Sequence, residues 1–258
     1  KKIIDFVSEF SFKLPVDVVC DMLGVPNEDR TLIRDWARLI LGALEPTLTD
    51  EEFKKGCDAV SNFKGYLKDQ VSMRKKNPEL NRDGEIISTL IEAQSSGAEL
   101  SEVELLHQCI FMLNAGHETS TNMLSHGIHE FINNKDELNS LRENQNYISS
   151  AVEEILRYQP PIQVNNRFNK KATVLSGEKI PQGSSVHMII AAANRDPNQF
   201  SKPNKFLISR HPNRHLSFGL GIHVCAGNTL ARIEGKVAFL KLINAFRDFP
   251  CESESLNS

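Results

Sequence analysis

Hydrophobic residues in the first 160 positions recur mainly with helical spacing. The clearest stripe lies in residues 101–134 and consists of Val103, Leu106, Ile110, Leu113, Leu124 and Ile128. Spacings of three and four place such residues on one helix face, so we expect one buried helix of about 30 residues. Ser101 followed by Glu104 has the form of a capping box, which predicts the start of this helix.

Shorter helical patterns flank that segment. A segment near 14–44 belongs to the same helical region, and further helices are expected near 50–75, 84–96, 135–144 and 146–159. Pro160 and Pro161 end the last of these, because proline cannot continue a helix. A final helix is expected from about 228 to 246.

The pattern changes after Pro161. β-branched residues and glycine-containing turns predict short strands up to about Val186, and a long loop rich in Asn, Pro, Gly and Arg follows. We therefore expect a mainly α protein with small β-sheets. Its single domain, 1–258, would comprise a helical part (about 1–160), strands and a cysteine loop (about 161–227) and the final helix.

Composition narrows the class of partner. Of the 258 residues, 40% are hydrophobic and 24% charged, the balance of a globular protein, and the net charge of -3 offers no basic surface for nucleic acid. No apolar stretch is long enough for a membrane span, and no signal-like core is evident. We expect a cytoplasmic protein that binds small molecules or other proteins.

The five cysteines are odd in number, scattered and free of C-x-x-C spacing, which favours a reducing compartment. We expect four of them to be inert packing residues: Cys20, Cys57, Cys109 and Cys251.

Cys225 differs, because it lies in the glycine-rich segment "HLSFGLGIHVCAG" just before a predicted helix. Amide groups and the helix dipole at that position stabilise a thiolate. Three interpretations remain open: a small buried cysteine, a zinc ligand, or a single axial thiolate to haem iron. The zinc site would use His211, His215, His223 and Cys225.

Two further motifs have structural and functional interpretations. In "AGHETS", Ala115 and Gly116 form a small-residue notch beside Glu118 and Thr119, which either admits a ligand or permits close helix packing. In "EEILR", Glu154 and Arg157 stand three residues apart, as in an ordinary helix surface pair.

Together and in this order, these motifs resemble those of the cytochrome P450 family of haem-thiolate monooxygenases, in its soluble bacterial branch. Phe218, Gly221, Cys225 and Gly227 match the family's F-x-x-G-x-x-x-C-x-G signature. "AGHET" matches the A-G-x-E-T pattern of the distal helix, and Glu154 with Arg157 matches E-x-x-R.

The resemblance implies haem b as cofactor and Cys225 as its iron ligand, with Phe218, Gly219, Gly221 and Gly227 close to the sulfur. It implies that Glu118 and Thr119 deliver protons to dioxygen and that Ala115 and Gly116 line the oxygen groove. Arg167 and His215 would bind the haem propionates. Glu154 and Arg157 would tie their helix to the loop before the cysteine segment.

Two departures from the family pattern stand out. The third member of the Glu–Arg network is expected in "KPNKF", where this sequence has Lys205, and a lysine cannot fork as arginine does. The chain also resembles a fragment that lacks the N-terminal third and the C-terminal hairpin of a family member.

The implied function is insertion of one atom of O2 into an apolar organic substrate. Electrons would come from a ferredoxin or flavodoxin served by an NAD(P)H-dependent reductase. A peroxide-using relative and a non-catalytic haem or small-molecule binding protein remain as alternatives.

Overall fold

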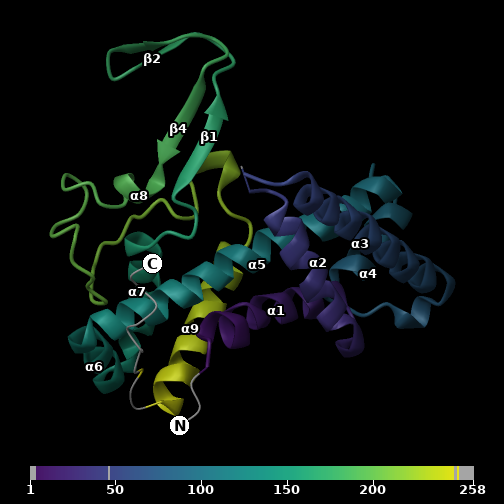
Figure 1. Ribbon diagram of the computed structural model, residues 1–258, viewed down its shortest axis with the longest axis horizontal. Helices are drawn as coiled ribbons and strands as arrows, with labels where there is room; N and C mark the ends of the chain where they lie inside the picture. Colours follow the sequence, from purple (N-terminus) through teal and green to yellow (C-terminus); the bar gives the residue numbers. More distant parts are fainter. Residues whose placement is uncertain (1–3, 46, 247–248, 250–258) are drawn as a thin grey trace. The chain divides into compact units, whose positions relative to one another are not determined.

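The computed structural model describes residues 4–45, 47–246 and 249 (Figure 1). The chain forms two compact units, residues 1–121 and 122–258. Helices dominate both, and the strands are short, so the expected class of mainly α with small β-sheets is confirmed. Within the described ranges, no helix combines the length and apolarity needed to cross a membrane.

The first unit is built from helices alone among its described residues. They are α1 (Lys13–Leu23), α2 (Arg30–Gly42), α3 (Asp50–Lys76), α4 (Ile86–Ser95) and the first part of α5 (Glu102–Asn133), with short turns η1 (Val7–Ser11), η2 (Asn27–Asp29) and η3 (Pro78–Leu80). Each of the five α-helices contributes fully buried side chains to one core, including Leu23, Ile33, Phe63, Ile87 and Leu113. The helices expected near 50–75 and 84–96 are confirmed.

Helix α5 confirms the long-helix prediction, with 32 residues. The capping box is present: the Ser101 amide donates to Glu104 Oε2 (2.8 Å), and the Glu104 amide donates to Ser101 Oγ (3.2 Å). Val103 was wrongly assigned to the buried stripe and is 51% exposed. The buried face centres on Cys109 and Leu113, and Val103 lies roughly 100° of helix rotation away from them.

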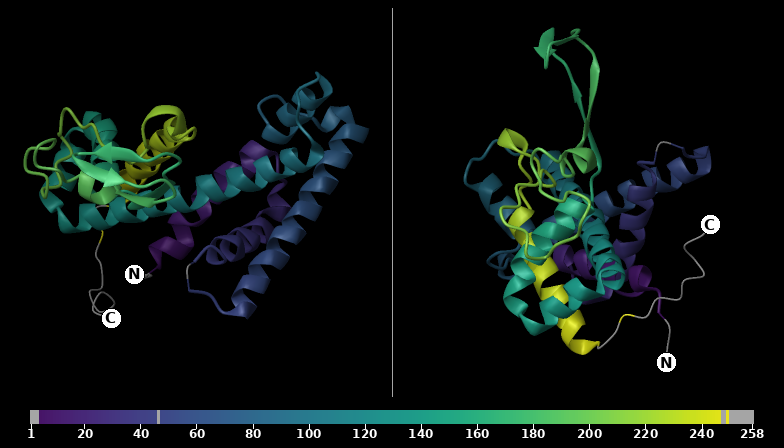
Figure 2. Two further views of the ribbon diagram at one scale, coloured as in Figure 1. Left: turned by 90° about the horizontal axis from the view of Figure 1, so that it is seen from above. Right: turned by 90° about the vertical axis from the view of Figure 1, so that its left-hand side faces the viewer.

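The second unit joins helices to two small antiparallel ribbons. Its helices are the rest of α5, α6 (Lys135–Glu143), α7 (Ile148–Tyr158), α8 (Ile190–Ala193) and α9 (Asn228–Ala245), with turns η4 (Gln145–Tyr147) and η5 (Gly221–His223). Strand β1 (Val164–Phe168) pairs with β4 (Ser185–Ile189), and β2 (Thr173–Leu175) pairs with β3 (Glu178–Ile180). In the right-hand view of Figure 2 these ribbons extend away from α6, α7 and α9.

The strands, the long loop and the final helix therefore fall where the sequence predicts them. The exceptions are α8, a single helical turn, and the short 3-10 turn η5, both inside the segment expected to be loop.

Glycines allow α5, α7 and α9 to pack closely in the second unit. A Cβ atom on Gly127 of α5 would lie 2.6 Å from Phe239 Cε1 and 2.9 Å from Ile155 Cδ1. On α9, a Cβ on Gly235 would lie 3.2 Å from both methyl groups of Val152. The rings of Phe131 and Phe239 meet edge-on at 5.6 Å. These contacts leave no room for an added methyl group at Gly127.

Replacing Gly127 with alanine should destabilise the protein by about 1–3 kcal/mol, because the new methyl group overpacks Phe239 and Ile155. Urea unfolding measures the effect. Gly65→Ala is the matched control, since a Cβ on this α3 residue meets nothing within 4 Å and alanine favours a helix interior by about 1 kcal/mol. Equal stability of the two variants would contradict the packing argument.

Candidate functional site

The loop that carries Cys225 is closed by its own backbone. The Cys225 amide donates to the Phe218 carbonyl (2.8 Å), and the Val224 amide donates to that of Gly221 (3.1 Å). Gly219 and Gly221 have φ values of 70° and 78°, in the left-handed region that favours glycine. The Asn228 side chain donates to the Cys225 carbonyl (2.6 Å) where α9 begins. The loop thus presents Cys225 from a fixed backbone.

Cys225 is exposed, and so are its apolar neighbours. Ile222 is 96% exposed, Leu220 83% and Val224 52%. Apolar side chains gathered around a thiol are typical of a surface that meets an apolar ligand. The interpretation of Cys225 as a small buried cysteine is therefore wrong.

The zinc interpretation also lacks support. Among the described residues, no three His, Cys, Asp or Glu side chains gather in an arrangement that could hold a metal ion. The His215 ring is instead engaged by Glu153, with Nε2 3.1 Å from Glu153 Oε2.

The other cysteines divide into two groups. Cys20 and Cys109 are buried, and burial raises the pKa of their thiols to about 12 and about 11. The prediction of a packing role is wrong for Cys57, which is exposed on α3 beside the buried Gly56. Cys251 lies outside the described residues.

The two predicted propionate ligands differ in their surroundings. Arg167 is exposed on β1, where its guanidinium donates to Asn165 Oδ1 (3.1 Å) and the Asn166 carbonyl (2.8 Å). The His215 side chain is only 3% exposed. Its Nε2 meets Glu153, and its Nδ1 accepts from the Ser217 amide (3.2 Å), so both ring nitrogens are occupied within the protein.

His223 is a residue that sequence reasoning considered only as a zinc ligand. It is exposed in η5, two positions before Cys225. Its place in the loop was visible in the sequence, but its exposure and the engagement of His215 were not.

The Glu154 carboxylate lies at the centre of a buried ionic network. Arg157 binds it through two nitrogens, Nε and Nη2, each at 2.8 Å, and both side chains are fully buried. The remaining Arg157 bonds go to backbone carbonyls of Asn194, Pro203 and Lys205. Glu154 and Arg157 therefore form far more than the surface pair that their spacing alone indicates.

The third member of this network is Arg210, and the expectation of Lys205 is wrong. Arg210 Nε lies 2.9 Å from Glu154 Oε2, and the Arg210 side chain is 5% exposed. Lys205 contributes its backbone carbonyl, which accepts from both arginines. Asn213 adds a side-chain donor to Glu154 at 3.1 Å. The forked arginine geometry is thus retained.

The "AGHETS" residues lie on an unbroken helix, so α5 is not opened at this point. Thr119 Oγ1 donates to the Ala115 carbonyl (2.9 Å), and Glu118 is exposed. A Cβ on Gly116 would lie 3.0 Å from Val19 Cγ2 of α1. The structural interpretation of Gly116, close helix packing, therefore has direct support.

His117 is a residue that the sequence did not single out. It is 1% exposed, its ring meets that of Phe12 edge-on at 4.4 Å, and burial lowers its pKa to about 4. Neither ring nitrogen has a hydrogen-bond partner among the described residues. The ring is therefore neutral at physiological pH and packs as an aromatic side chain.

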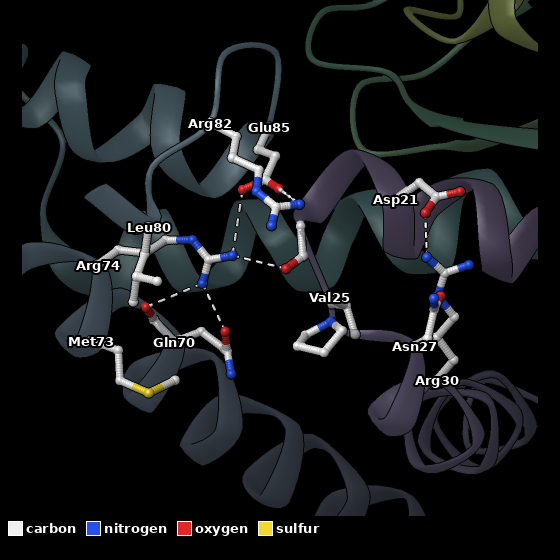
Figure 3. A pocket seen from close by; sticks show the side chains of 12 residues that line it. Asp21, Val25, Asn27, Arg30, Gln70, Met73, Arg74, Leu80, Arg82 and Glu85 are labelled. Atoms are coloured by element: carbon white, nitrogen blue, oxygen red, sulfur yellow. Dashed lines mark hydrogen bonds and ion pairs between the residues drawn. The ribbon is translucent and has the colours of Figure 1, made fainter. Parts of the chain in front are cut away.

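A polar cavity of about 480 Å³ lies elsewhere in the first unit (Figure 3). Arg74 dominates it, donating to the carbonyl of Gly24 (2.8 Å) and to Gln70 Oε1 (2.7 Å), with Glu85 at 3.4 Å. Arg30 pairs with Asp21 on the other side. These contacts join the end of α1 to α2, to α3 and to the residue that precedes α4.

Comparison with known proteins identifies the family. The family model described as Cytochrome P450 matches residues 41–257, a range that contains all three motifs. The chain belongs to the cytochrome P450 family. Members of this family bind haem, iron protoporphyrin IX, through a cysteine thiolate.

Curated and solved P450s support this assignment. The chain is 36% identical to cytochrome P450 CYP107DY1 of Priestia megaterium, over 99% of this chain and 60% of that protein. Among solved structures, P450BioI in complex with a hexadec-9Z-enoic acid-ligated acyl carrier protein has a TM-score of 0.87 and 36% identity, over 95% of this chain and 62% of that one. CYP109E1 of Bacillus megaterium with corticosterone has a TM-score of 0.88 and 33% identity, over 97% and 67%.

The chain spans about 60% of the length of the curated P450s it matches. The solved structures confirm the P450 fold for the part that this chain represents.

Arg210→Lys should destabilise the protein by about 1–3 kcal/mol, because lysine cannot replace a buried fork and leaves acceptors unsatisfied. Chemical denaturation measures the change. Lys205→Ala is the control, since only the backbone carbonyl of Lys205 serves the network. A larger loss from the Lys205 variant would show that the third member was wrongly assigned.

Proposed function

We propose that the protein containing this chain is a haem-thiolate monooxygenase that uses Cys225 as the iron ligand. The observation that carries the proposal is the exposed Cys225 thiol on a closed loop rimmed by exposed apolar side chains. This surface fits a flat, largely apolar macrocycle whose iron takes one ligand from the protein. When bound, the haem supplies the dioxygen chemistry that inserts one oxygen atom into substrate and releases the other as water.

The glycines of the loop support this fit. Gly219 and Gly221 adopt left-handed backbone conformations that turn the chain tightly before Cys225. A Cβ on Gly227 would lie 4.0 Å from Cys225 Sγ, so glycine keeps the space beside the sulfur open. Phe218 supports the loop through its backbone carbonyl, which accepts a hydrogen bond from the Cys225 amide.

For the haem propionates we assign Arg167 and revise the choice of histidine. Arg167 is an exposed cation. His215 would have to leave Glu153 to reach a propionate, whereas His223 is exposed on the cysteine loop itself. His223 is therefore the better candidate for a charge-assisted hydrogen bond to a carboxylate.

Glu118 and Thr119 are assigned to proton delivery. The Thr119 hydroxyl donates to the Ala115 carbonyl, which leaves its oxygen lone pairs free to accept a hydrogen bond from water. Glu118 is exposed and can exchange protons with solvent. Ala115 and Gly116 are assigned to the oxygen groove because neither has a side chain larger than a methyl group. The presence of the acid and alcohol pair favours a monooxygenase over a peroxide-using relative.

The substrate class proposed is an apolar organic molecule. Two similar structures support it, since one holds a fatty acyl group on a carrier protein and the other corticosterone. Electrons would come from a ferredoxin or flavodoxin reduced by an NAD(P)H-dependent enzyme. Cytoplasmic location is proposed because the four described cysteines are all free thiols.

Cys225→Ala should abolish the thiolate signature in the carbon monoxide difference spectrum of the reduced full-length protein, because no sulfur would remain to bind the iron. Cys57→Ala is the matched control, an exposed cysteine on α3 outside the loop. A thiolate signature that persists without Cys225 would contradict the proposal. Haem binding without this signature in the unaltered protein would favour a non-catalytic haem protein.

Thr119→Ala should retain haem and substrate binding but release more hydrogen peroxide for each NAD(P)H consumed, because proton delivery loses its hydroxyl. The ratio of product to NAD(P)H oxidised measures this coupling. Thr121→Ala is the control, since Thr121 also donates from its hydroxyl to a carbonyl four residues earlier, that of His117. Unchanged coupling in the Thr119 variant would remove Thr119 from the proton path.

A further inference from the structure

A second ionic cluster in the second unit links α7, α9 and the cysteine loop. Arg232 of α9 binds the Glu153 carboxylate through Nε (2.6 Å) and Nη2 (3.0 Å). His215 Nε2 meets the same carboxylate at 3.1 Å. Glu153 precedes the motif residue Glu154 but belongs to a separate set of contacts, since Glu154 binds Arg157 and Arg210.

From Arg232 the contacts continue to Cys225 by two routes. Arg232 Nη1 donates to Asn228 Oδ1 (2.7 Å), and the Asn228 amide group donates to the Cys225 carbonyl (2.6 Å). The Arg232 guanidinium also lies over the Phe218 ring, 4.5 Å from its centroid. The Phe218 carbonyl in turn accepts from the Cys225 amide. One side chain therefore supports both sides of the backbone that presents the sulfur.

The negative charge of Glu153 stabilises its contacts with Arg232 and His215. Burial alone would raise the pKa of the Glu153 carboxyl, but hydrogen bonds from His215 and Arg232 outweigh it and lower the pKa to about 2. The carboxylate is therefore ionised at physiological pH. The hydrogen bond to Glu153 also raises the pKa of Arg232, so both partners of the pair hold their charges.

We propose that Glu153 and Arg232 are a positioning pair that holds the Cys225 loop in the geometry needed for thiolate ligation. Glu153 fixes the arginine fork, and the fork fixes Asn228 and Phe218, which hold Cys225 from its carbonyl and amide sides. The inference rests on the proposed haem ligation by Cys225. Neither residue touches the reacting groups, so their effect passes through the cysteine loop.

The test compares the unaltered full-length holoprotein with Glu153→Gln, Arg232→Gln and the milder Arg232→Lys. The measurement is the rate at which the thiolate band of the reduced carbon monoxide complex converts to the band of a protein without thiolate ligation. Groups that orient a metal ligand affect metal binding by about 10- to 100-fold, so we expect the glutamine variants to convert about tenfold faster. The double glutamine variant should be no worse than either single one, because the pair acts as a unit.

Two controls separate positioning from general stability. Glu51→Gln makes the same substitution in an exposed ion pair of α3, with Lys55 at 2.7 Å, and should leave the band unchanged. Urea unfolding of each variant measures global stability. Faster conversion in the Glu153 and Arg232 variants at similar stability supports the positioning role.

The other outcomes have distinct meanings. A stable thiolate band in all three variants would overturn the inference. The inference would also be overturned if the variants lost haem in proportion to their loss of unfolding free energy, while the variant protein that kept haem showed an unaltered thiolate band. If the unaltered protein itself shows no thiolate band, the proposed function fails first, and that result is independent of the variants.

Discussion

The buried Glu154 carboxylate is the constraint on which much of the second unit depends. It accepts from Arg157, Arg210, Asn213 and the backbone amide of Leu207 (2.8 Å) while being fully buried. A buried charge is costly unless it is paired and hydrogen-bonded. The irregular segment 203–213 must therefore follow a path that brings these donors to Glu154. Hydrogen bonds donated to this one carboxylate hold the loop in place, where regular secondary structure is absent.

The position of the cysteine segment depends on this loop, which precedes it in the chain. Beyond Asn213, the Ser217 hydroxyl donates to the Leu156 carbonyl (2.7 Å), and the Leu216 amide donates to Asn194 Oδ1 (2.8 Å). Glu153, one residue earlier on α7, directs its carboxylate to Arg232 of α9 instead. Two consecutive glutamates thus fix the start and the end of the segment that leads to Cys225. Both glutamates lie on α7, so this helix positions both ends of the segment.

Sequence reasoning succeeded where the signal was local. The long helix, its capping box and the strand region depend on residues close together in the chain, and they were predicted near their observed bounds. The family motifs likewise located Cys225 and Glu154 within short stretches. The errors concern contacts between distant residues. Arg210 reaches Glu154 across 56 positions, and no spacing rule distinguished it from Lys205.

Burial was the other limit of prediction. His215 looked like an available cation, but its ring is covered and bound by Glu153, whereas His223 is open. Val103 shares the spacing of the buried stripe yet lies at the edge of the face that the first unit covers. Both facts depend on which side chains fold over a position, and a periodic pattern does not contain that information.

The buried His117 ring, whose nitrogens form no hydrogen bond with any described residue, makes the folding of the first unit sensitive to acid. An unfolded chain takes up a proton on histidine near pH 6.5, whereas burial delays that uptake in the native state until about pH 4. Between these pH values the unfolded state binds more protons than the native state. Lowering the pH through this range therefore reduces the free energy of unfolding, by about 3 kcal/mol in total. The same ring that packs as a neutral aromatic group at neutral pH therefore couples unfolding of the protein to proton uptake at low pH.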